Sequence, residues 1–116
     1  METKQNLIVT KTFNFSKEVI KVYINLKKDK VVELASQLIR SATSIGANVE
    51  EAQAAQSKRD FISKMSIAAK EARETRYWLR LLNETAITEK DVNHLLKEIE
   101  EIINILTKII KTSSVN

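Results

Sequence analysis

The most regular pattern of apolar residues runs from Val31 to Leu82 and is interrupted once, at Gln56 and Ser57. Before the break, apolar or small residues recur at alternating steps of four and three: Val31, Ala35, Leu38, Ala42, Ile45, Val49 and Ala52. After the break, a similar spacing is found at Phe61, Met65, Ala68, Ala72, Leu79 and Leu82. Steps of four and three keep side chains on one face of a helix, which has about 3.6 residues per turn. The two segments therefore predict an antiparallel helical hairpin.

One further helix is predicted on each side of this hairpin. The first begins at about Thr12, which is a good N-cap residue, and carries the apolar stripe Phe15, Val19, Val22 and Leu26. The last follows a capping-box-like pair, Thr88 and Asp91. Its apolar positions are Val92, Leu95, Leu96, Ile99, Ile102, Ile103, Leu106, Ile109 and Ile110. Four helices with short connections predict an all-α, antiparallel up-down-up-down four-helix bundle.

The boundaries follow from capping and turn signals. The second helix is expected from about Asp29 to Gln56, and the third from Ser57, whose hydroxyl caps it three residues before Asp60. Small residues along the second helix, among them Gly46, predict that a neighbouring helix approaches closely. We expect one domain over residues 1–116, with residues 1–11 and 112–116 loose and the apolar run 7–9 docked on the body.

Composition narrows the class of protein. The chain has 116 residues, no proline, no cysteine and one glycine, which favours helices over sheets and excludes disulfides and thiolate metal sites. No segment resembles a signal peptide, and none approaches the roughly 20 apolar residues of a membrane span. We therefore expect a soluble, cytoplasmic protein without membrane contact.

The formal net charge of +4 is distributed unevenly. Residues 1–30 and residues 58–80 each carry seven basic and three acidic groups. Residues 31–57 carry one basic and three acidic groups, and residues 81–116 carry four and six. Such alternation suits either nucleic acid or acidic neighbours within an assembly.

The third helix separates charges by sign around its axis. On a helical wheel with Phe61 at zero, one side, between about +60° and 180°, collects most of the basic residues. We predict a nucleic-acid-binding surface there, because phosphates need several cations and an aromatic ring can stack on a base. Its candidate residues are Lys58, Arg59, Lys70, Arg73, Arg76, Tyr77 and Arg80. The alternative is that these cations pair with acidic residues of the same chain or of a neighbouring subunit: Glu50, Glu98, Glu100 or Glu101.

The opposite side of the third helix carries Asp60, Glu71 and Glu74 beside apolar residues that lie off the core seam. Those apolar residues are Ile67, Trp78 and Leu81. An apolar stripe on a bundle whose core is already supplied predicts an oligomer interface.

No residue set predicts catalysis. The only histidine, His94, follows Asp91 at i+3, whereas a di-iron bundle needs Glu-x-x-His on two helices. A single glycine cannot form a phosphate-binding loop, and no serine has an evident base and orienting acid. The polar residues Asn48 and Glu51, beside the second seam, are expected to be satisfied locally or by solvent. We expect no enzyme activity, no cofactor, no metal and no small-molecule substrate.

Three segments carry a family resemblance: Ser41–Ala52, Ala55–Ile62 and Ala69–Leu79, which read SATSIGANVEEA, AQSKRDFI and AKEARETRYWL. In order and spacing they resemble the four-helix bundle family that includes proteins encoded in intervening sequences of bacterial 23S ribosomal RNA genes. The accessory protein of diversity-generating retroelements is related to them. The match is close over the two central helices and looser over the rest of the chain.

The resemblance implies a small, bacterial, non-enzymatic protein that assembles as a homopentameric barrel and acts as a binding or scaffold module. For the retroelement accessory type it also implies a basic surface that binds nucleic acid and a reverse transcriptase. This chain departs from that type in having Glu50, where relatives often carry a basic residue, and in being less positive overall. By position, the shared framework residues are Asn48, Glu51, Ser57, Phe61, Glu71, Glu74, Tyr77 and Trp78.

Overall fold

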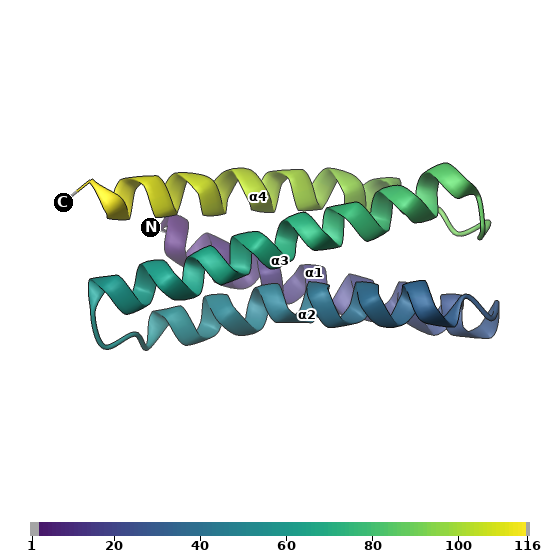
Figure 1. Ribbon diagram of the computed structural model, residues 1–116, viewed down its shortest axis with the longest axis horizontal. Coiled ribbons are helices and arrows are strands. Elements are labelled where there is room, and N and C mark those ends of the chain that lie inside the picture. Colours follow the sequence, from purple (N-terminus) through teal and green to yellow (C-terminus); the bar gives the residue numbers. More distant parts are fainter. Residues whose placement is uncertain (1–2, 116) are drawn as a thin grey trace.

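The computed structural model of the protein describes residues 3–115, and within them it contains four α-helices and no strand. The helices are α1 (Lys4–Lys28), α2 (Val32–Gln53), α3 (Lys58–Thr85) and α4 (Asn93–Ser114). Each helix packs on the next along the chain, and α1 also packs on α4, so that every helix has two neighbours. Figure 1 shows the α1–α2 and α3–α4 connections at one end of the molecule. The α2–α3 connection and the C-terminal end lie at the other.

The apolar seams of the sequence form the core. All seven seam residues of the second helix are buried, from Val31 to Ala52. In α3 the seam is buried except for Phe61, which is half-buried and packs on the edge of the core. Thr75 fills the gap that the sequence pattern leaves between Ala72 and Leu79, and it is fully buried. The fold class predicted from the spacing, all-α with four helices, is therefore correct.

The largest difference from the sequence prediction is at the start of α1. The helix begins at Lys4 rather than Thr12, and the hydroxyl of Thr3 caps it by accepting from the amide of Asn6 at 3.1 Å. Ile8 is fully buried, and buried Thr12 donates its hydroxyl to the carbonyl of Ile8 at 2.7 Å. Thus Thr12 is an interior core position and not a cap. The prediction of loose ends also covered residues 1, 2 and 116, which lie outside the described residues.

The other boundaries also differ by a few residues. Helix α2 is shorter than predicted, because the chain turns at Lys30, which has a left-handed backbone (φ 66°). The predicted cap of α3 is correct: Ser57 accepts from the amide of Asp60 at 3.0 Å. The predicted cap of α4 is wrong. The hydroxyl of Thr88 accepts from the amide of Lys90 at 3.1 Å, and α4 begins only at Asn93.

Close packing between helices occurs where the small residues predicted it. A Cβ built on Gly46 of α2 would lie 3.5 Å from the carbonyl oxygen of Thr12 and 3.5 Å from Oγ of Ser16, both in α1. Between α2 and α3, the buried hydroxyls of Ser41 and Thr75 are 2.8 Å apart. Helix α2 is therefore held between two neighbours by small and hydroxyl-bearing side chains.

Candidate interaction surfaces

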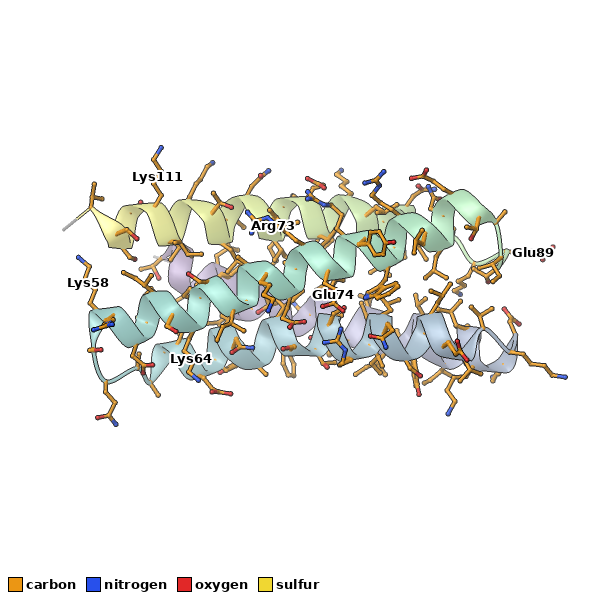
Figure 2. All side chains as sticks on the ribbon, viewed as in Figure 1. Lys58, Lys64, Arg73, Glu74, Glu89 and Lys111 are labelled. Carbon is orange, nitrogen blue, oxygen red and sulfur yellow. The ribbon has the colours of Figure 1, made fainter. Side chains whose placement is uncertain are left out.

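The two flanks of α3 differ in their predominant charge, although Lys64 lies on the acidic flank and Glu84 on the basic one. Figure 2 shows Arg73 on the side of α3 that faces α4, and Glu74 and Lys64 on the side that faces α2. The two flanks have different surroundings.

The acidic flank is occupied within the chain. Arg40 of α2 bridges two carboxylates of α3, contacting Glu74 and, at 3.4 Å, Glu71. One turn further along, the indole N–H of Trp78 donates to the Glu74 carboxylate at 3.0 Å. Lys64 pairs with Glu51 across the same helix boundary at 3.1 Å. This flank therefore joins α2 to α3, and Glu51 and Glu74 have local partners.

Part of the basic flank is also paired within the chain. Arg76 contacts Glu100 of α4 at 2.9 Å, which is one of the pairings expected as the alternative to nucleic acid. Arg80 lies 3.5 Å from Glu84, one turn along its own helix. Glu98 and Glu101 contact Lys11 of α1 instead, at 2.6 and 3.8 Å.

Three further cations of the basic flank have no acidic partner among the described residues. Arg59, Lys70 and Arg73 are exposed and form no ion pair there, and Tyr77, 54% exposed, lies beyond them. Lys58, the remaining candidate, is exposed at the first turn of α3. Two exposed lysines of α4, Lys108 and Lys111, add positive charge that was not among the predicted nucleic-acid-binding residues. The sequence could have indicated these two lysines, because residues 102–115 contain no aspartate or glutamate.

A shallow groove runs between α3 and α4 on this flank. Its lining residues are Ser66, Ala69, Arg73, Thr107, Ile110 and Lys111. A second hollow lies at the end of the bundle, where Lys58 and Arg59 meet Ile62, Ser113 and Ser114. Cations beside hydroxyl groups form a surface suited to phosphate oxygens.

The predicted interface residues of α3 differ in exposure. Ile67 is 40% exposed, and Leu81 is half-buried. Trp78 is less exposed than its position on the helical wheel suggested, because it packs on the edge of the core. Its ring also meets the Tyr77 ring edge-on, with the two ring centres 5.2 Å apart. The expectation that Trp78 lies well off the core is therefore only partly correct.

Helix α1 carries an exposed apolar surface that was not predicted from the sequence. Phe13, Ile20 and Ile24 are 58%, 41% and 49% exposed, and their spacing of seven and four places them on one face. Nζ of Lys17 lies 5.4 Å from the centre of the Phe13 ring. Lys21 donates to Glu18 at 3.0 Å, and this hydrogen bond lowers the pKa of the Glu18 carboxyl. We call Phe13, Ile20 and Ile24 the α1 stripe.

Nothing in the described residues groups three or more side chains of histidine, aspartate or glutamate in an arrangement suited to a metal ion. His94 is exposed at the start of α4. Asn48 donates to the carbonyl and hydroxyl of Ser44 at 2.9 and 3.2 Å, so it is satisfied locally. Among the described helices, none combines the length and apolar character that crossing a membrane requires.

Comparisons with known proteins agree on one family. The family profile of the 23S rRNA-intervening sequence protein matches residues 4–108. Among solved structures, this chain is similar to a protein of unknown function from the S23 ribosomal protein family of Bacteroides thetaiotaomicron, with 40% identity and a TM-score of 0.87. The similarity covers 94% of this chain and 99% of that one. No curated protein sequence matches the chain.

Proposed function

The chain belongs to the 23S rRNA-intervening sequence protein family, and from this premise we propose that it is a non-enzymatic, homo-oligomeric binding or scaffold module of the cytoplasm. In this proposal each subunit is an antiparallel up-down-up-down bundle, and five subunits, the number implied by the family resemblance, form a barrel. The observation that carries the proposal is apolar surface left outside a filled core. Twenty-five hydrophobic side chains are buried among the described residues, yet large apolar side chains remain exposed on α1 and α3.

Exposed apolar surface in a bundle with a complete core favours contacts between copies. Ile67 and Leu81 remain candidate interface residues on α3. Trp78 stays a candidate as well, but its indole also holds Glu74, so its replacement would change stability as well as assembly.

The mass of the unmodified protein in solution tests this proposal. We expect sedimentation equilibrium to give a multiple of the 13.2 kDa chain mass, five in the barrel proposed here. A single chain at micromolar concentration would refute it.

A second candidate function is binding of RNA or DNA by the basic flank of α3. The observation that favours it is a stretch of three cations that form no ion pair with any described residue, Arg59, Lys70 and Arg73, which Lys108 and Lys111 of α4 extend. With Lys58, Arg76, Tyr77 and Arg80, these residues present cations and one exposed ring to a phosphate backbone. The opposing consideration is that Arg76 and Arg80 already have acidic neighbours.

Salt-dependent binding to duplex DNA and to a structured RNA tests this candidate. We expect Lys70→Glu/Arg73→Glu to weaken binding and to reduce the slope of log K against log salt by about two, because about one phosphate contact is lost per residue. Lys90→Glu/Lys97→Glu is the control with the same change in net charge, since both lysines are exposed and lie outside the basic flank. No retention of the unmodified protein at low salt, or equal loss in the control, would exclude the candidate.

A further inference from the structure

We propose that the α1 stripe of one copy docks on the outer face of α2 in a second copy. This inference rests on the homo-oligomer proposed above and deepens it by naming the two surfaces that meet. We call the outer face of α2, formed by Ser36, Thr43, Ala47, Glu50 and Ala54, the α2 outer face.

The α1 stripe lies on the side of α1 opposite its core face. The buried residues of α1 include Phe15, Val19 and Leu26, and on a helical wheel the stripe lies about 140° from them. About half of the surface of each stripe side chain is left open by the described residues. From Phe13 to Ile24 the stripe is about 16 Å long, at 1.5 Å per residue. A surface of that length and chemistry is suited to lie along another helix.

Lysines flank the α1 stripe. Lys17, Lys21, Lys27 and Lys28 are exposed and lie within about 80° of it on the wheel. Glu18, the one acidic residue of α1, lies about 140° from the stripe and is held by Lys21. A partner surface must therefore be able to contact apolar side chains at its centre and should carry negative charge at its margins.

The α2 outer face has this complementary character. Its alanine, serine and threonine side chains are short, so that large residues of another helix can lie close to its backbone. Glu33 and Glu50 are exposed and form no ion pair within the described residues. The only cation of the helix, Arg40, is engaged by Glu71 and Glu74. By contrast, the carboxylates of α4 are largely occupied, since Glu98, Glu100 and Glu101 contact Lys11 or Arg76.

The two surfaces lie on adjacent helices of the same subunit, and they face different directions. Contact between two different surfaces generates a ring when the rotation between copies closes, whereas contact of one surface with itself generates a dimer. Helices α1 and α2 are neighbours in the bundle and are not diagonally opposite. Their outward directions are therefore inclined to one another, which favours a small closed ring over a straight filament.

Mixing two variants tests the inference, because each variant disables one surface. Ile20→Glu places a carboxylate in the α1 stripe, and Ala47→Arg/Glu50→Lys places bulk and positive charge on the α2 outer face. We expect each alone to raise the subunit dissociation constant by roughly tenfold or more. An equimolar mixture should form a 1:1 dimer of twice the 13.2 kDa chain mass, through the one intact surface of each. Ile87→Glu, at an isoleucine of the α3–α4 connection that is 54% exposed against 41% for Ile20, is the control and should assemble normally.

Each alternative occupant gives a different result. If Ala47→Arg/Glu50→Lys still forms a dimer alone and Ile20→Glu does not, the α1 stripe meets itself, and the inference is wrong. If both variants keep the mass of an oligomeric unmodified protein, the surfaces named here are wrong while the homo-oligomer stands. If the unmodified protein is monomeric and binds anionic lipid vesicles through α1, both proposals fail. Circular dichroism of each variant confirms that lost assembly is not lost folding.

Discussion

Individual backbone conformations show that glycine is not placed where this fold would benefit most from it. Gly46 is interior to α2, where glycine costs about 1 kcal/mol relative to alanine. Lys30 and Ala86 have left-handed backbones, with φ of 66° and 52°, a conformation that glycine adopts more readily. The sequence predicted close packing at Gly46. It did not predict the two left-handed residues, because lysine and alanine carry no signal for that conformation.

We predict that Gly46→Ala stabilises the protein. Its new Cβ would lie 3.5 Å from both Thr12 and Ser16, an ordinary van der Waals distance, and the helix would gain about 1 kcal/mol. Ala86→Gly should also stabilise, because it removes the steric cost of the left-handed cap. Each change should raise the melting temperature by about 4 °C. A lower melting temperature for Gly46→Ala would mean that α1 and α2 cannot accept even one methyl group.

Among the elements, α1 shows most clearly what a sequence pattern can and cannot predict. Buried positions in α1 continue at steps of four and three from Ile8 through Thr12 to Phe15. The helix was predicted to begin at about Thr12, because threonine is a good N-cap residue. In the structure its hydroxyl donates to the carbonyl one turn earlier, so a threonine can occupy a core position. Thr75 broke the pattern of α3 in the same way, and its hydroxyl donates to the carbonyl of Glu71 at 2.8 Å.

We predict that the first two turns of α1 contribute to the stability of the whole bundle. Ile8→Ala should lower the free energy of unfolding by about 3 kcal/mol, because it leaves a cavity at a fully buried site. Leu7→Ala removes an adjacent side chain of similar size that is 40% exposed, and should cost about 0.5 kcal/mol or less. Urea denaturation measures both. Equal, small effects would mean that residues 4–11 do not pack on the core in solution.

For the molecule as a whole, the sequence predicted the core better than it predicted the surfaces. Apolar spacing identifies which residues are buried, since burial within one chain follows from helix geometry. Exposure depends on neighbouring helices as well. Trp78 is partly covered, whereas Phe13, Ile20 and Ile24 are left open although their spacing of seven and four was visible in the sequence. The charge separation on α3 was predicted from the sequence. The structure was needed to show that Glu74 pairs with Arg40 on one flank and that Arg76 pairs with Glu100 on the other.

The stoichiometry of the unmodified protein is the measurement that bears most directly on this account. Native mass spectrometry from a low-salt, neutral solution would count the chains in each particle without labels or substitutions. We expect a discrete species of several 13.2 kDa chains, with five the proposed number, that persists on dilution to low micromolar concentration. A spectrum containing only single chains would contradict the account, because the exposed apolar side chains of α1 and α3 would then have no copy to meet.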